Sequence, residues 1–330
     1  MKAGLMAQVL LDNTAMKSTR STDGRSVRVP CGILVVDKPE GLTSFSVVKK
    51  VQKWLRLEKA GHCGTLDPFA TGALLICVNQ ATRISDLLSL QSKRYLATLE
   101  LGIETDTLDR TGEVVGRYQG EPIRVEGLSS ALQMFRGTFM QQVPQFAAVH
   151  VAGRRMYEYA RKGIQVDAPV REVCVHNLEL TAFEWPFATL DISCSKGTYV
   201  RQLGADVGRH LGCGAHLNSL RRLESGPFRI EQAVSFNELS ELKNLEEIRS
   251  RVVPMSEALD HLPRVVMDDE GLLRRLQVGS IDSAWEETAR KVCPLGSTPV
   301  RILDGSEALR ALWWPNQQEE QGRRLRVFKN

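Results

Sequence analysis

Two short apolar runs place the strongest constraint on how this chain of 330 residues folds. One run covers residues 33–36 and the other residues 73–78, and segments rich in glycine and proline lie next to them. Short apolar runs with many β-branched residues, bounded by turn signals, are typical of strands buried on both faces. The longer run falls far short of the ~20 apolar residues that cross a bilayer. The pattern therefore predicts a sheet covered by other elements and no membrane-spanning segment.

Helix and strand patterns alternate along the rest of the chain. Thr43 or Ser44 can cap a helix after the first run. Further strands are predicted over 95–101 and 190–194, and helices over 128–135 and 200–211. The buried stripe predicted for the first helix consists of Phe45, Val48, Val51 and Leu55. These patterns predict a mixed α/β fold with one large sheet and flanking helices.

Length and proline positions predict two folded units after a tail. Residues 1–30 carry five Lys or Arg and two acids without periodicity, which predicts a flexible basic tail. Pro254 and Pro263 mark a boundary, so we expect a main domain over 31–255 and a small β-rich module over 264–330. Strand-like runs in this module cover 265–267, 300–303, 309–313 and 325–328, and its basic end carries Arg323, Arg324, Arg326 and Lys329.

Composition narrows the classes of function. The net charge is only +4, so a nucleic-acid site would be a local basic patch. The seven cysteines include no C-x-x-C pair, and the apolar stretch 5–11 makes a poor signal peptide, so we expect reduced thiols in the cytosol. No zinc-ligand spacing, P-loop or dinucleotide-binding motif is found, so we expect neither a metal nor a cofactor.

One loop stands out chemically. Residues 61–72 read GHCGTLDPFATG, with three glycines and a proline that exclude a regular element. Asp67 before Pro68 could simply form an Asx turn. The segment, however, closely resembles the G-H-x-G-x-L-D-P-x-A-x-G signature of TruB-family pseudouridine synthases.

The resemblance continues in the same order over residues 31–230. The GILVVDKP segment, residues 32–39, resembles the opening strand of the family, and K-R-Y at 93–95 resembles its next motif. Residues 102–109 resemble L-G-x-x-T-D-T-x-D, residues 196–201 resemble K-G-T-Y-[IV]-R, and residues 212–222 resemble the block that follows. The resemblance implies the pseudouridine synthase fold, with a large mixed, mainly antiparallel sheet and a PUA-like RNA-binding module over 264–330.

The resemblance also implies roles for individual residues. Asp67 matches the catalytic aspartate, Tyr95 the tyrosine against the target base, and Arg201 the arginine that pairs with the aspartate. An arginine in the first turn of the predicted helix is otherwise disfavoured by the helix dipole, and a nearby anion would explain it. The substrate-binding residues implied are His62 for base flipping, Leu220 in the apolar pocket, Tyr199 and Lys196.

The resemblance implies isomerisation of uridine to pseudouridine at position 55 in the T loop of tRNA. The RNA-binding insertion is expected at about 120–175, with contacts from Arg154, Arg155, Arg161 and Lys162. The partner is then the T-arm stem-loop of tRNA, bound by a monomer that needs no protein partner and no membrane. The sequence 157–161 resembles the bacterial stand-alone enzymes.

Three other hypotheses remain open at this point. A guide-RNA-dependent rRNA pseudouridine synthase would require partner proteins. A non-catalytic RNA chaperone would keep the same fold and basic surface. A glycosidase-like hydrolase would require a second carboxylate ~5 to 9.5 Å from the first.

Overall fold

The protein is described by a computed structural model. It describes residues 29–151, 153–242, 244–280, 290, 298–315 and 325–329. The tail predicted over residues 1–30 therefore lies outside the described residues, apart from its last two positions, as do Arg323 and Arg324 of the basic end.

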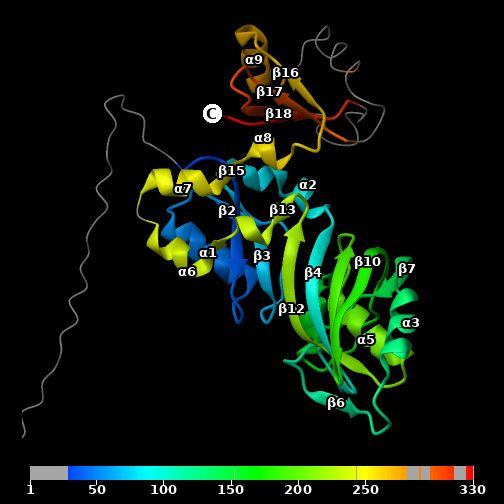
Figure 1. Cartoon of the computed structure of the whole chain (residues 1–330). Helices are drawn as coiled ribbons and strands as arrows, with labels where there is room; N and C mark the ends of the chain where they lie inside the picture. Colours follow the sequence, from blue (N-terminus) through cyan, green and yellow to red (C-terminus); the bar gives the residue numbers. More distant parts are fainter. Residues whose placement is uncertain are drawn as a thin grey trace, which may run out of the picture.

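A large mixed sheet forms the centre of the molecule (Figure 1). Its strands β1 and β14 pair parallel, as do β3 and β12, whereas the other neighbours in the main strand order pair antiparallel. The strands in spatial order are β14 (Val234–Ser235), β1 (Gly32–Lys38), β3 (Thr71–Val78), β12 (Ala215–Ser225), β4 (Lys93–Leu101), β11 (Phe187–Cys194), β10 (Val170–Glu184) and β7 (Gly137–Gln142). Short strands β2 (Ala60–His62), β13 (Phe228–Arg229) and β15 (Val252–Pro254) pair with β3, β12 and β1. The predicted mixed, mainly antiparallel sheet is confirmed.

The two apolar runs lie in neighbouring strands that are buried on both faces. Residues 33–36 belong to β1 and residues 73–78 to β3. Leu34, Leu74 and Ile76 pack into the cluster on one face, while Ile33 and Leu75 pack into the cluster on the other. Because side chains alternate along a strand, a continuous apolar run supplies both clusters at once.

Helices cover the sheet at both ends (Figure 1). α1, α6 and α7 lie near β1, and α3 and α5 lie near β10 and β7. The helices of the described residues are α1 (Ser44–Trp54), α2 (Ser85–Ser89), α3 (Val125–Gln133), α4 (Met156–Ala160), α5 (Val200–His210), α6 (Phe236–Glu241), α7 (Leu245–Arg251), α8 (Met255–Ala258) and α9 (Glu270–Gln277). None of them is long and apolar enough to cross a membrane.

The first helix corrects one prediction. Thr43 caps α1, and its hydroxyl accepts the Ser46 N–H at 3.0 Å. Phe45, predicted in the buried stripe, is 64% exposed, and the Lys49 ammonium lies over its ring at 5.4 Å. The other three predicted residues are buried, and Ser44 and Val47 complete the buried face. The buried face begins at Ser44, which an apolar pattern does not detect because serine is polar.

A second sheet of four strands forms the C-terminal part of the described chain. Its strands are β16 (Arg264–Val266), β17 (Val300–Leu303), β18 (Leu309–Trp313) and β19 (Leu325–Val327). All four predicted strands are confirmed to within one residue. Leu303, Leu309, Leu312 and Phe328 from this region share one hydrophobic cluster with β1, β3 and α8. The two sheets therefore have a common core, and the PUA-like identity of the module stays a prediction.

Two hairpins project from the main sheet. One pairs β5 (Ile103–Thr105) with β6 (Val114–Arg117), and the other pairs β8 (His150–Val151) with β9 (Arg154–Arg155). The range 120–175, predicted as an RNA-binding insertion, includes β7 and the start of β10, which belong to the main sheet. Residues 143–169, between these strands, carry the second hairpin and α4.

Candidate active site

The loop that carries Asp67 runs from β2 to β3. Hydrogen bonds to the end of β1, to the turn after it and to the start of α1 fix this loop. The buried Ser44 hydroxyl accepts the Leu66 N–H at 2.8 Å and donates to the Leu66 carbonyl at 3.0 Å. The Pro68 carbonyl accepts the Gly41 N–H at 2.8 Å and the Lys38 ammonium at 3.1 Å. The residues on both sides of Asp67 are thus held, although the loop has no regular secondary structure.

Asp67 and Arg201 form the predicted ion pair. The Arg201 Nε donates to Asp67 Oδ2 at 2.8 Å, and Nη2 lies 3.5 Å from Oδ1. The side chain of Asp67 is 35% exposed, whereas that of Arg201 is 5% exposed. Backbone carbonyls of Thr107 and Phe146 accept from Nη1 at 2.8 Å and from Nη2 at 3.0 Å. A fixed cation therefore orients one carboxylate that reaches solvent.

A second carboxylate, that of Asp109, lies next to Arg201 but is shielded from solvent. Asp109 is 4% exposed, and its Oδ2 lies 3.6 Å from the Arg201 Nη1. Its Oδ1 accepts the Thr107 hydroxyl at 3.0 Å, the Thr111 N–H at 3.0 Å and the Thr111 hydroxyl at 2.5 Å. Asp109 therefore closes a turn and helps to hold Arg201.

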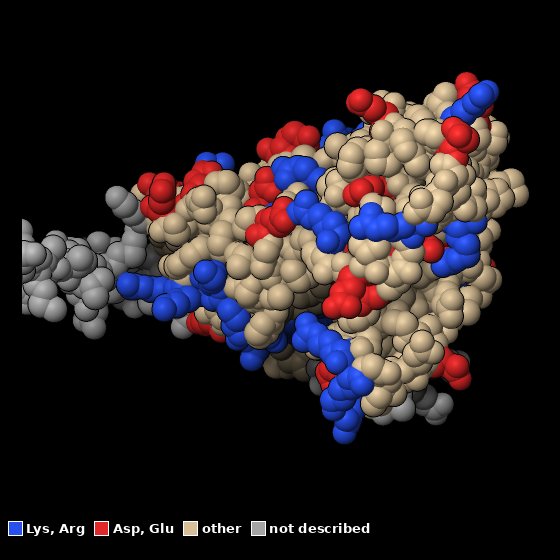
Figure 2. Space-filling model, turned by 90° about the horizontal axis from the view of Figure 1, so that it is seen from below, with Lys and Arg blue, Asp and Glu red and all other residues tan. Residues whose placement is uncertain are grey.

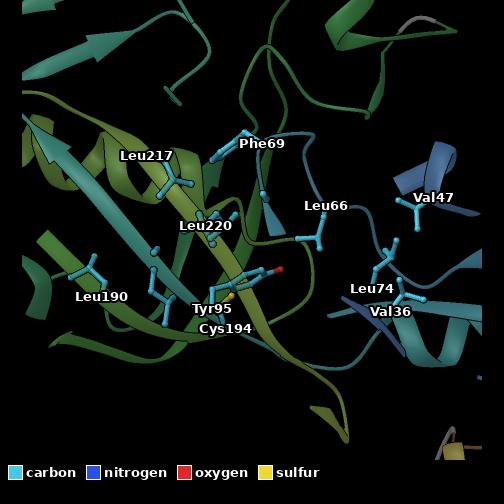
Figure 3. Close-up of a cluster of buried hydrophobic side chains, with 14 of the residues drawn as sticks. Val36, Val47, Leu66, Phe69, Leu74, Tyr95, Leu190, Cys194, Leu217 and Leu220 are labelled. Carbon is cyan, nitrogen blue, oxygen red and sulfur yellow. The ribbon is translucent and has the colours of Figure 1, made fainter. Parts of the chain in front are cut away.

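An apolar wall adjoins the loop. Tyr95 on β4 and Leu220 on β12 are 9% and 8% exposed, and they belong to one cluster with Leu66 and Phe69. Figure 3 shows the side chains of Tyr95 and Leu220 next to each other, with Leu66 and Phe69 from the loop nearby. Burial raises the pKa of the Tyr95 hydroxyl, and the Arg222 guanidinium acts in the opposite direction. Tyr95 is therefore neutral near pH 7.

His62 comes immediately before the loop, on β2. Burial, and secondarily the Arg222 charge, lowers the pKa of its imidazole below the usual 6.5, so the ring is neutral near pH 7. Its Nδ1 is buried and has no hydrogen-bond partner within the described part of the chain. Within the described residues, Nδ1 therefore makes no hydrogen bond that would fix the orientation of the ring.

Two family models match this chain. The family model described as TruB family pseudouridylate synthase (N terminal domain) matches residues 52–200. The model described as tRNA pseudouridylate synthase B C-terminal domain matches residues 201–260. The chain belongs to the TruB family.

Relatives and solved structures agree with this membership. A Syntrophobacter fumaroxidans protein named tRNA pseudouridine synthase B is 50% identical over 300 residues, which cover 91% of this chain and 98% of that protein. The protein of the same name from Geobacter sulfurreducens is 39% identical over 303 residues, covering 90% and 99%. A crystal structure of a Cbf5-Nop10-Gar1 complex contains a chain with the same fold, at a TM-score of 0.67, 24% identity and coverage of 93% and 87%. This chain is a pseudouridine synthase with the fold expected for the family.

The TruB-family motif at 196–201 begins in the turn after β11 and ends in the first turn of α5. Tyr199 is the residue before the first turn of α5, and Arg171 lies over its ring at 5.3 Å. Burial raises the pKa of the Tyr199 hydroxyl, opposed by Arg171 and Arg201. Lys196 is exposed and lines an open groove of about 690 Å³ together with Arg171 and His150.

The four basic residues predicted to contact RNA all lie in the segment 143–169 of this TruB-family chain. Arg154 and Arg155 form β9, and Arg161 and Lys162 follow α4. All four are exposed, and the Arg161 guanidinium lies over the Tyr157 ring at 5.4 Å. None of the contacts described here joins them to Asp67, so their assignment stays a prediction.

Arg222, for which the sequence predicts no role, holds both ends of the loop through its guanidinium. It is 1% exposed, its Nε donates to the Ala73 carbonyl at 2.7 Å, and its Nη2 donates to Gly64 at 3.3 Å. The backbone of Gly72 pairs with Arg222, and a Cβ at Gly72 would lie 2.3 Å from the Arg222 carbonyl oxygen. Strand alternation offers one signal, because residue 222 shares a face with Leu220.

Proposed function

We propose that this chain isomerises uridine to pseudouridine at position 55 in the T loop of tRNA. The observation that carries the proposal is one carboxylate, Asp67, held by the buried Arg201 beside the apolar wall of Tyr95 and Leu220. The names of the relatives support tRNA as the substrate. We expect the reaction in the cytoplasm.

The chemistry suits a single anionic group. Uridine and pseudouridine are isomers, so the C1′–N1 bond breaks, a C1′–C5 bond forms, and the proton lost from C5 is balanced by one gained at N1. We propose that Asp67 acts as a nucleophile or assists elimination. Arg201 donates to both carboxylate oxygens and so holds the reacting group in one orientation.

The target base must leave the folded RNA loop before it reacts. We propose that the flipped base packs against Tyr95 and Leu220, and that His62 fills the space left in the RNA. Unstacking costs a few kcal/mol, which these contacts offset. A neutral imidazole suits stacking against bases.

RNA is proposed to bind through exposed basic side chains. Figure 2 shows Lys and Arg side chains in bands across the face seen from below, with acidic side chains between them. We propose phosphate contacts from Lys196, Arg154, Arg155, Arg161 and Lys162. The C-terminal module, proposed to be PUA-like, would add further contacts.

A guide-dependent synthase is the second candidate, because solved structures of similar fold come from complexes such as the archaeal box H/ACA sRNP Nop10-Cbf5 complex. We favour the stand-alone enzyme, a monomer without a protein partner, because of the 50% identical relative. The test is to incubate the purified chain alone with unmodified tRNA and to map pseudouridine with carbodiimide. Modification at position 55 supports the proposal, and a requirement for added partners supports the second candidate.

The structure disfavours a hydrolase, and an assay separates a chaperone from a synthase. Asp109, the nearby second carboxylate, is buried and already accepts three hydrogen bonds. Hydrolysis would also release free uracil, which chromatography of the reaction products detects. A purely chaperone role would leave tRNA unmodified while still speeding its folding.

A further inference from the structure

The start of α5 is held in an unusual way. Tyr199 occupies the N-cap position, and its side chain makes no capping hydrogen bond. The side-chain amide of Gln141, on β7 and distant in the sequence, instead pairs with the backbone of this N-cap residue. The Tyr199 N–H donates to Gln141 Oε1 at 2.8 Å, and Gln141 Nε2 donates to the Tyr199 carbonyl at 3.1 Å.

This pairing requires both functions of an amide. Gln141 is 1% exposed, so water does not take over either hydrogen bond if the amide is removed. A carboxylate of the same length accepts but cannot donate, and a thioether does neither. The next residue, Gln142, is exposed on the opposite face of the strand.

The two hydrogen bonds between Gln141 and the Tyr199 backbone act on the turn that carries Arg201. Arg201 lies two residues after Tyr199, in the first turn of α5. The segment that follows Gln141 also supplies the Phe146 carbonyl, which accepts from the Arg201 Nη2 at 3.0 Å. The backbone before Arg201 and one acceptor of its guanidinium are therefore set by one stretch, residues 141–146.

We propose that Gln141 is a positioning residue for the isomerisation, acting through the Tyr199 backbone to set Arg201 against Asp67. This inference rests on the proposed function. It assigns to a buried, uncharged residue, which acts through the Tyr199 backbone, a part in the rate of the chemical step. Misplacement of a catalytic pair by about 1 Å is enough to lower a rate on the order of a hundredfold.

The test is a double-mutant cycle in the full-length protein. With T-arm hairpin as substrate, Gln141→Met should lower kcat by about ten- to a hundredfold and leave KM within about twofold. In an Arg201→Met background the same change should have no further effect on kcat, because the residue through which it acts is gone. Gln142→Met, the matched change on the outer face, should turn over like wild type.

Other outcomes overturn the inference. Equal turnover of folded Gln141→Met and wild type contradicts it, and so does a loss that multiplies with that of Arg201→Met, as general destabilisation would. Should Gln141→Met fail to fold, Gln141→Glu keeps the acceptor for Tyr199 N–H and must still lower kcat. A wild-type chain that forms no pseudouridine would instead contradict the proposed function itself.

Discussion

The guanidinium of Arg201 is surrounded by acceptors from three separate parts of the chain. Asp67 comes from the loop after β2, Thr107 from the turn after β5, and Phe146 from the segment before β8. At the scale of the single residue, this convergence explains why a cation occupies the first turn of a helix, where the dipole alone disfavours it.

Arg201→Met should therefore affect both chemistry and stability. We expect kcat to fall by at least about a hundredfold, because Asp67 loses its orientation. Two half-buried carbonyls would lose their donor, at a cost of at most about 1–3 kcal/mol each in the free energy of unfolding. Steady-state kinetics and urea unfolding measure the two effects. Lys162→Met, at an exposed position, should leave kcat unchanged, and equal losses of kcat in both variants would contradict this account.

Lys38 gives a test through pH. Burial lowers the pKa of its ammonium from 10.5 to about 8, an effect partly opposed by Asp67. Between these values the unfolded chain binds the proton that the native chain has released, so stability from this group rises with pH. In Lys38→Met the free energy of unfolding between pH 8 and 10 should rise less steeply than in wild type, by at most about 1.4 kcal/mol per pH unit. Lys53→Met, at an exposed position on α1, should keep the wild-type slope.

At the scale of elements, the loop between β2 and β3 depends on its neighbours for its shape. Ser44 makes both hydrogen bonds to Leu66 from the first residue of α1. Ser44→Ala should lower the free energy of unfolding by about 1–3 kcal/mol, because the buried Leu66 N–H loses its acceptor. It should also lower kcat, whereas Ser46→Ala, further along the helix, should change neither. Thermal unfolding and kinetics of both variants check this, and a fully active Ser44→Ala would contradict the supporting role of α1.

Sequence patterns predict the elements well where one periodicity dominates. The alternation of Tyr95, Ala97, Leu99 and Leu101 predicts β4, and the apolar runs predict β1 and β3. The prediction that Phe45 is buried was wrong. An aromatic residue at near-helical spacing is easily assigned to the buried face, but the polar Ser44 takes that position.

The candidate site was only partly predictable. The predicted pairing of Asp67 with Arg201 followed from the family resemblance, and the structure contains it. Arg222 and Gln141 could not be assigned, because their partners are set by long-range strand register and close approach in three dimensions. A polar residue in an apolar strand signals a buried partner without identifying it.

At the scale of the whole molecule, the two sheets share one core. Phe328 is 2% exposed in the cluster that also contains Ile33 and Met255, and Arg83 lies over its ring at 5.2 Å. The C-terminal sheet lies beside α8 and β15 in Figure 1. The module is therefore not expected to unfold alone.

Phe328→Ala should destabilise both sheets together. We expect a loss of about 3–5 kcal/mol in the free energy of unfolding. Urea unfolding followed by tryptophan fluorescence and by far-ultraviolet circular dichroism should give coincident transitions, both at lower urea than in wild type. Two separate transitions, with only one shifted, would contradict a shared core.

The central claim is that the Asp67 carboxylate carries out the isomerisation. The most direct measurement compares wild type with Asp67→Asn in single-turnover reactions on unmodified tRNA, followed by carbodiimide mapping and a filter-binding titration. The substitution keeps the size of the side chain and removes its negative charge. We predict pseudouridine at position 55 with wild type, none with Asp67→Asn, and tRNA affinities that agree within about threefold. Turnover by Asp67→Asn within tenfold of the wild-type rate would contradict the claim.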